Sequence, residues 1–124
     1  MENIDVYPQF PQVYLRPGKV NSEEAIAKLT HYAYSVEKDA CENYEAFSPL
    51  DVQVFRNTKT GETILKVLIA CNGPTVEFTV AVSDGNNTEI DGELWDYPEI
   101  VRAGFNGEMP SFAMWCEEYA EENT

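Results

Sequence analysis

Apolar residues recur at intervals of three and four from residue 21 to residue 47, and this spacing predicts an amphipathic helix over Asn21–Phe47. Asn21, with Glu24 three residues later, forms a capping-box-like start. The same spacing predicts a shorter helix from its cap, Ser111, to about Glu122. Each helix therefore has one apolar stripe to bury. The first stripe contains Ile26, Leu29, Ala33, Val36, Ala40, Tyr44 and Phe47, and the second contains Phe112, Trp115, Cys116 and Tyr119.

Between the two helices the pattern changes to alternation of apolar and polar residues, which is typical of β-strands. The sequences T-K-T-G at 58–61 and N-G at 72–73 are turn signals that separate three such segments. We therefore predict a three-stranded antiparallel meander. The predicted strands are Leu50–Asn57, Glu62–Cys71 and Thr75–Ser83. The apolar side chains on the second face of this sheet, which need cover, are Phe55, Ile64, Leu68 and Ala70.

The remaining segments are predicted to be extended or to turn. Three prolines exclude a helix from residues 1–20 and favour an extended strip with a short edge strand at Val13–Leu15. Pro98 opens a predicted helical turn that reaches Arg102 and stops at Gly104. The fold class that follows is α+β: a three- to four-stranded antiparallel meander with a long N-terminal helix and a short C-terminal helix, in one domain over residues 1–124.

The composition adds a strong acidic bias. The chain is 44% hydrophobic, enough for a packed core, yet its net charge is −14. Residues 67–124 hold twelve of the 22 acidic residues and a single basic one, Arg102. Such a charge repels nucleic acid and anionic membranes, and it excludes the double-stranded-RNA-binding function that the order of elements would otherwise allow. The uneven placement indicates a dedicated acidic face, although acids that serve only solubility would give the same composition.

The three cysteines, Cys41, Cys71 and Cys116, are odd in number and form no C-x-x-C pair. Cys41 and Cys71 fall at apolar positions of their segments, which predicts buried free thiols in a reducing compartment. The sequence shows no signal-peptide pattern and no apolar run of membrane-spanning length. We therefore predict a cytoplasmic protein.

The stretch Asp84–Glu99 carries six carboxylates and no basic residue. If it contains a strand, Glu89, Asp91 and Glu93 share one face about 6.6 Å apart, because a strand rises ~3.3 Å per residue. Phosphates of one DNA strand follow every ~3.4 Å of helix axis, so such a row can imitate a nucleic-acid backbone. Alternatively, the D-G pair at 91–92 is a hairpin turn, which breaks the row. The predicted partner-binding residues of this stretch are Asp84, Glu89, Asp91, Glu93, Trp95, Asp96, Tyr97 and Glu99.

Two aromatic residues and the last helix add to the predicted partner-binding surface. Trp95 and Tyr97 suit interface anchors, since these residue types are enriched in binding hot spots, although packing beneath a loop is an equal alternative. The carboxylates of the last helix face the negative end of its dipole, at a cost of roughly 0.3–1 kcal/mol each where exposed. Stability alone would favour lysines there, so we add these acids to the predicted partner-binding surface, unless they only mark a fraying turn. They are Glu117, Glu118, Glu121 and Glu122.

No catalytic or metal-binding pattern emerges. The sequence from Asp84 superficially resembles a calcium loop, but Glu89 replaces the glycine required at the sixth position and Trp95 stands where the bidentate glutamate belongs. We find no phosphate-cradling glycine loop, no His/Cys metal cluster, and no nucleophile with an obvious base. We therefore predict no enzymatic activity, no metal and no cofactor, and keep an enzyme or a calcium-binding domain as the least favoured alternatives.

These observations predict a non-enzymatic inhibitor that imitates nucleic acid and blocks the Lys/Arg-lined DNA or RNA channel of a nuclease or RNA-guided defence complex. In size, charge and order of elements the chain resembles phage-encoded anti-restriction and anti-CRISPR proteins, which implies a target in the cytoplasm of a bacterial host. The alternative is an acidic immunity or adaptor protein that neutralises a basic protein. A homodimer through the apolar sheet face is a further possibility, whereas direct binding to nucleic acid or a membrane is not expected.

Overall fold

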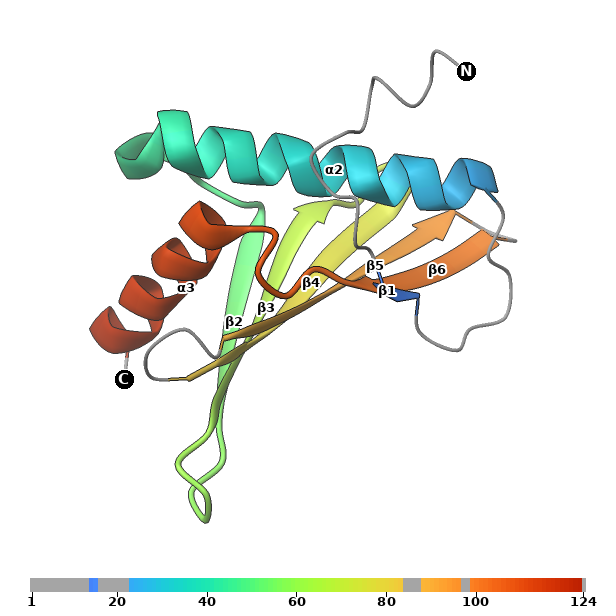
Figure 1. Cartoon of the computed structure of the whole chain (residues 1–124). Coiled ribbons are helices and arrows are strands. Elements are labelled where there is room, and N and C mark those ends of the chain that lie inside the picture. The colour runs from blue at the N-terminus through green and yellow to red at the C-terminus, as the bar shows by residue number, and fades with distance from the viewer. Residues whose placement is uncertain (1–13, 16–22, 84–87, 97–98, 124) are drawn as a thin grey trace.

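A six-stranded antiparallel sheet and two helices make up the described part of the computed structural model, which comprises residues 14–15, 23–83, 88–96 and 99–123. Both helices lie on one side of the sheet (Figure 1). The α+β fold class is therefore confirmed, with more strands than the three or four predicted. The elements are β1 (Tyr14–Leu15), α2 (Glu23–Glu42), the 3-10 turn η1 (Tyr44–Ala46), β2 (Asp51–Arg56), β3 (Thr63–Ala70), β4 (Thr75–Val82), β5 (Glu89–Asp96), β6 (Glu99–Gly104) and α3 (Pro110–Glu122).

The spatial order of the strands is β1-β6-β5-β4-β3-β2, so β2 to β6 form a meander and β1 pairs with β6 at the far edge. The three predicted strands are β2, β3 and β4, and the two predicted turns between them contain Gly61 and Gly73 at φ values of +78° and +100°. This left-handed conformation favours glycine, which has no Cβ. The edge strand predicted in the N-terminal strip is present as β1, and the rest of residues 1–20 lies outside the described residues.

The core lies between the sheet and the two helices. Phe78 of β4 meets Phe105 and the α3 residue Phe112 edge to face, with ring centroids 6.0 Å and 5.6 Å away. All three rings are fully buried, and each such pair adds about 0.5–1.5 kcal/mol beyond its buried area. The sheet contributes further buried side chains from every long strand except β2: Leu65, Val67, Val76, Val80, Ile90, Leu94, Val101 and Ala103.

Helix α2 ends at Glu42, so its predicted extension to Phe47 is wrong. Asn43 leaves the helical conformation with φ −130° and ψ 51°, and its side-chain amide donates to the Asp39 carboxylate at 3.0 Å. Asparagine disfavours helix interiors because its side chain can form such local hydrogen bonds. The turn η1 then redirects the chain, and Phe47 packs into the core. The predicted stripe is otherwise present, with Leu29, Ala33, Val36 and Ala40 buried.

Residues Glu89–Asp96 form β5, so the alternative of a hairpin turn at Asp91-Gly92 is wrong. Gly92 faces the core in the middle of this strand. A Cβ added there would lie 2.8 Å from a ring carbon of Phe78 and 2.9 Å from a ring carbon of Phe105. Real Cβ atoms essentially never approach so closely. This glycine is therefore needed for close packing of two aromatic rings rather than for a turn.

The helical turn predicted from Pro98 to Arg102 is also wrong, because residues Glu99–Gly104 form β6. Val101 and Ala103 are buried, whereas Arg102 between them is exposed. This alternation matches a strand with one face on the core, and β6 pairs with β5 along its whole length. The pairing outweighs the tendency of a proline to open a helix.

Helix α3 begins at Pro110, and its cap comes from a distant residue rather than from Ser111. The two oxygens of the Glu37 carboxylate accept hydrogen bonds from the backbone N–H groups of Ser111 and Phe112, at 3.0 and 2.9 Å. A carboxylate at this position satisfies two N–H groups that have no partner within the helix and suits the positive end of the helix dipole. Glu37 thereby ties α2 to the start of α3.

Cys41 and Cys71 are exposed, which contradicts the prediction that both are buried. A β-bulge near the end of β3 shifts the alternation of side chains before Cys71, and Cys41 lies on the outer side of α2. Cys116 of α3 is fully buried. This burial, followed by the charge of the neighbouring Glu117, raises the pKa of the Cys116 thiol well above its usual value. A raised pKa keeps the thiol protonated and unreactive.

Candidate partner-binding surface

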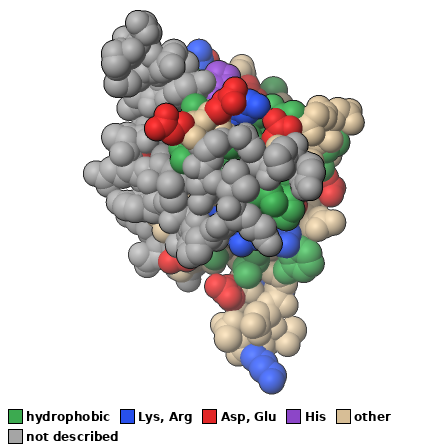
Figure 2. Space-filling model, turned by 90° about the vertical axis from the view of Figure 1, so that its right-hand side faces the viewer, with side chains coloured by type: hydrophobic (Ala, Val, Ile, Leu, Met, Phe, Trp, Pro, Cys, Tyr) green, Lys and Arg blue, Asp and Glu red, His purple; other side chains and the backbone are tan. Residues whose placement is uncertain are grey.

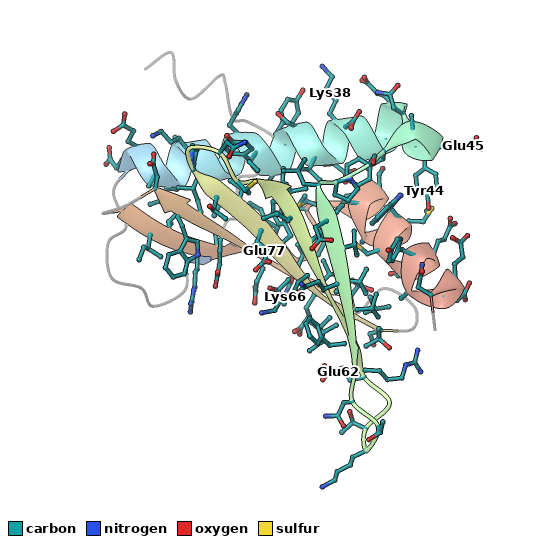
Figure 3. All side chains as sticks on the ribbon, turned by 180° about the vertical axis from the view of Figure 1, so that it is seen from behind. Lys38, Tyr44, Glu45, Glu62, Lys66 and Glu77 are labelled. Atoms are coloured by element: carbon teal, nitrogen blue, oxygen red, sulfur yellow. The ribbon has the colours of Figure 1, made fainter. Side chains whose placement is uncertain are left out.

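The side of the sheet that carries no helix, here called the open sheet face, presents the acidic residues of β5. Glu89, Asp91 and Glu93 alternate with the buried residues Ile90, Gly92 and Leu94, so the three carboxylates share this face. Their spacing along the strand is about 6.6 Å, as predicted from the rise of ~3.3 Å per residue. Figure 3 views the molecule from behind and labels Lys66 and Glu77 on neighbouring strands of the same sheet.

Neighbouring strands add a fourth carboxylate and one base to this row. Glu77 of β4 and Arg102 of β6 lie on either side of Glu93 in the strand register. The Arg102 Nε donates to Oε2 of Glu93 at 2.6 Å, and the Trp95 indole N–H donates to its Oε1 at 3.0 Å. Like charges directly opposite each other destabilise a sheet, and Arg102 offsets the repulsion between Glu77 and Glu93. Glu93 is therefore held by two contacts, one from Arg102 on the neighbouring strand and one from Trp95 on its own strand.

The open sheet face also exposes aromatic surface. The exposed fractions of Phe55 and Trp95 are 49% and 44%. The Lys66 Nζ lies 6.0 Å from the centroid of the Phe55 ring, within the range of a cation–π contact. Ile64 and Leu68, which were predicted to need cover, are half-buried by their neighbours on the sheet. The face thus combines carboxylates with exposed aromatic side chains. Aromatic residues are enriched in protein–protein interfaces, whereas Glu and Asp are depleted there.

Asp96 faces the helices rather than the open sheet face. It follows Trp95 in β5 and therefore points to the opposite side, where its Oδ2 accepts from the Lys28 Nζ of α2 at 3.0 Å. Both side chains are more than a third exposed, so this ion pair contributes at most about 1 kcal/mol to stability. Glu99 lies opposite Asp96 in the register of β6. Asp84 and Tyr97 lie outside the described residues.

The carboxylates of α3 lie on the other side of the sheet from the row on β5. Phe112 and Cys116 pack α3 into the core on the helix side, and the outer residues of α3 point away from the sheet. Glu117 is half-buried and accepts a hydrogen bond from the Thr88 hydroxyl at 2.6 Å, so its predicted outward position is wrong. The two acidic groups therefore do not form one surface. The exposed carboxylates of α3 are Glu118, Glu121 and Glu122.

The Tyr44 side chain of η1 lies beside the carboxylates of α3. No described atom forms a hydrogen bond of normal geometry with its buried hydroxyl oxygen. Burial, followed by the nearby Glu118 and Glu122, raises the pKa of Tyr44 well above its usual value. The last turns of α2 and α3 contain no basic residue. Neither helix therefore offsets the negative charge at its own C-terminal end.

The described residues show no metal site and no membrane-spanning helix. Among them, no group of three or more His, Cys, Asp or Glu side chains is placed to hold a metal ion. Neither α2 nor α3 combines the length and apolar character that crossing a bilayer requires. No protein-family model, curated protein or solved structure matches the chain significantly.

Sequence reasoning missed part of this surface. Glu77 lies in the predicted strand Thr75–Ser83, but only the strand register shows that it is opposite Glu93. Arg102 was assigned to a helical turn, and the alternation of apolar residues around it was the signal that could have placed it in a strand. At the end of the molecule seen in Figure 2, acidic, basic and hydrophobic side chains are intermixed. The acidic residues of the described surface at that end are therefore not gathered into one uniform patch.

Proposed function

We propose that this protein is a non-enzymatic inhibitor that imitates the nucleic-acid backbone and occupies the Lys/Arg-lined DNA or RNA channel of a nuclease or RNA-guided defence complex. The observation that carries the proposal is the row of Glu89, Asp91 and Glu93 on the open sheet face, joined by Glu77. A sheet presents such a row at fixed intervals, as a nucleic acid presents its phosphates. The proposed partner is thus a basic nucleic-acid-binding protein, met in the cytoplasm of a bacterial host.

The net charge of −14 supports fast, salt-sensitive association with such a partner. Long-range attraction is screened within about 10 Å at 0.1 M salt and about 3 Å at 1 M. Inhibition is therefore expected to weaken steadily as salt is added. Burial of Trp95 or Phe55 against the partner would add a contribution that salt does not screen.

A competition experiment tests the proposal. The immobilised protein is incubated with a panel of purified restriction nucleases and RNA-guided nuclease complexes, with and without a short DNA duplex. We expect at least one complex to bind, to be inhibited, and to be displaced by the duplex. Capture that the duplex does not reduce would contradict mimicry of nucleic acid.

Charge-reversal variants test which surface of the protein binds the partner. The double change Glu89→Lys and Asp91→Lys is expected to weaken binding of the captured complex about tenfold or more, because it places cations against a cationic channel. The matched control is Glu118→Lys with Glu121→Lys on α3, which changes the net charge equally on the other side of the sheet. Equal losses in both variants would indicate general attraction rather than a specific carboxylate row.

The second candidate function is an acidic immunity or adaptor protein that neutralises a basic protein. The exposed rings of Phe55 and Trp95 and the Arg102–Glu93 ion pair favour it, because a phosphate backbone has no counterpart for them. This candidate predicts a captured basic protein that DNA does not displace. It also predicts that Trp95→Ala weakens binding more than the Glu89 and Asp91 reversals do.

A further inference from the structure

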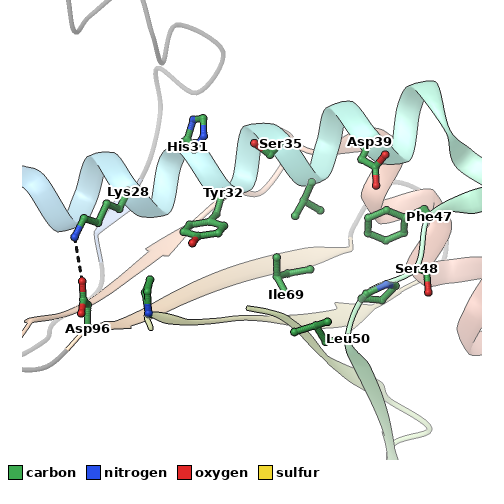
Figure 4. Close-up of a pocket in the computed structure, with 13 residues that line it drawn as sticks. Lys28, His31, Tyr32, Ser35, Asp39, Phe47, Ser48, Leu50, Ile69 and Asp96 are labelled. Atoms are coloured by element: carbon green, nitrogen blue, oxygen red, sulfur yellow. Dashed lines mark hydrogen bonds and ion pairs between the residues drawn. The ribbon is translucent and has the colours of Figure 1, made fainter. Parts of the chain in front are cut away.

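A cavity of about 730 Å³ lies between α2 and the sheet. Helix α2 forms its roof and the segment from Phe47 to Leu50 closes one end (Figure 4). Ile69 of β3, Pro74 in the turn after β3, and Asp96 of β5 contribute to its floor. Cavities that bind small ligands or side chains of a partner typically have volumes of roughly 300–1,000 Å³. This one is therefore large enough to take a bulky apolar side chain together with its neighbours.

The body of the cavity is apolar, and irregular backbone shapes it. Tyr32 of α2, Phe47, Leu50 and Ile69 line it. Ile69 is the residue at which the pairing of β3 with β4 shifts register, and such bulges re-aim side chains and recur beside functional sites. Leu50 at the rim is 60% exposed, more than any other large hydrophobic residue of the described surface. A partner side chain that covered Leu50 would remove apolar area from water.

Charges are placed at the two ends of the cavity. At one end Lys28 pairs with Asp96, so these two charges offset each other. At the other end Asp39 lies near Phe47, on the side of α2 that faces the cavity (Figure 4). The Asp39 carboxylate accepts a hydrogen bond from the neutral Asn43 amide, and Lys28 at the opposite end is the only Lys or Arg of the described lining. The Asp39 end therefore carries a net negative charge, and a cationic group of a ligand would be favoured there.

We infer that the cavity receives an apolar side chain of the partner protein, followed in the partner by a basic residue that meets Asp39. This inference rests on the proposed function, because it takes the partner to be a basic protein. The two surfaces meet at the end of β5, where Trp95 belongs to the open sheet face and the next residue, Asp96, lines the cavity. A partner segment that crosses the ends of the strands therefore contacts both.

Short peptides test the inference without knowledge of the partner. The probes are acetylated, amidated Arg-Leu-Phe-Arg, its acidic analogue Glu-Leu-Phe-Glu, and its polar analogue Arg-Ser-Ser-Arg, each titrated into the ¹⁵N-labelled protein and followed by NMR. The first peptide is expected to bind about tenfold more tightly than either analogue and to shift the amide signals of Ser35, Ser48 and Ile69. Equal affinity for the three peptides, or shifts confined to the open sheet face, would overturn the inference.

Two pairs of variants on α2 sharpen the test. Ser35→Trp places a large side chain over the cavity from an exposed position and should abolish peptide binding, whereas Lys38→Trp, exposed on the same helix outside the cavity, should not. Asp39→Lys should remove the preference for the basic over the acidic peptide, whereas Glu42→Lys should keep it. Circular dichroism confirms that each variant is folded. Retained binding in a folded Ser35→Trp variant would contradict the inference.

The roles proposed for the cavity and for the carboxylate row can be refuted separately. If Ser35→Trp weakens capture of the partner but the Glu89 and Asp91 reversals do not, the cavity is an anchor site and mimicry by the row is wrong. If only the reversals weaken capture, the proposed function holds and the cavity plays no part in binding the partner.

Discussion

Replacement of Gly92 by alanine tests whether the row on β5 is oriented as described. The added Cβ would lie 2.8 Å from the Phe78 ring and 2.9 Å from the Phe105 ring. Both rings are fully buried and packed edge to face, so neither can move without disturbing the core. Overpacking of this kind costs about 1–3 kcal/mol, and alanine regains roughly 0.5–1 kcal/mol through the lower backbone entropy of the unfolded chain. The expected net loss in free energy of unfolding is about 1–2 kcal/mol.

Urea unfolding followed by circular dichroism and tryptophan fluorescence measures this loss. We expect a lower midpoint with an unchanged slope, and a fall in Tm of about 3–8 °C for a domain of this size. Phe105→Leu in the Gly92→Ala background should recover part of the loss, with a coupling of more than about 0.5 kcal/mol in the double-mutant cycle. A Gly92→Ala variant as stable as the wild type would show that Gly92 does not face these rings. The outward direction of Asp91 and Glu93 would then be refuted as well.

Two further predictions concern the contacts that α3 makes with Glu37 of α2 and with Tyr44 of η1. Glu37→Ala removes the acceptor for two backbone N–H groups and should lower the free energy of unfolding by about 1–2 kcal/mol. Glu37→Gln should lower it less. An unchanged urea midpoint for the alanine variant would contradict the cap. Burial and the nearby Glu118 raise the pKa of Tyr44 in the folded state above the ~10 of the unfolded chain. The neutral hydroxyl therefore contributes to stability below about pH 10, and this contribution is lost as the pH rises further. The stability of the wild type relative to Tyr44→Phe should therefore be constant up to about pH 9 and fall as the pH is raised above about 10. A difference that stays constant up to about pH 11 would refute the shift.

The sequence was most informative where one face of an element meets the core. Period-2 alternation found β2, β3 and β4, and the spacing of three and four found both helices, because burial repeats along each element with the period of its backbone. Two of the turn signals were also informative, because Gly61 and Gly73 lie in the predicted turns with positive φ values. These features depend on neighbours in sequence, which is why they can be recognised without a structure.

Several of the misplaced features depend on contacts between residues that are distant in sequence. Gly92 resembles a turn glycine in sequence, and only the rings of Phe78 and Phe105 across the core explain its position in a strand. Ser111 is a common capping residue, yet Glu37, more than seventy residues away, supplies the cap. The cavity beneath α2 is lined by residues from distant segments, such as Tyr32, Leu50 and Ile69, which only the fold brings together.

The single base of the C-terminal half bears on the proposed mimicry of nucleic acid by the row of Glu89, Asp91 and Glu93. Arg102 lies beside the row, where it holds Glu93 and offsets the repulsion from Glu77. At first sight it weakens the imitation of a phosphate backbone by neutralising one charge. However, a carboxylate fixed in the free protein loses little side-chain entropy on binding, whereas freely rotating glutamates lose about 0.5–1.5 kcal/mol each. Arg102 therefore reduces the net charge of the row but fixes the geometry at one end of it. Under the proposed function, this fixed geometry would distinguish mimicry of a regular backbone from diffuse attraction to any basic surface.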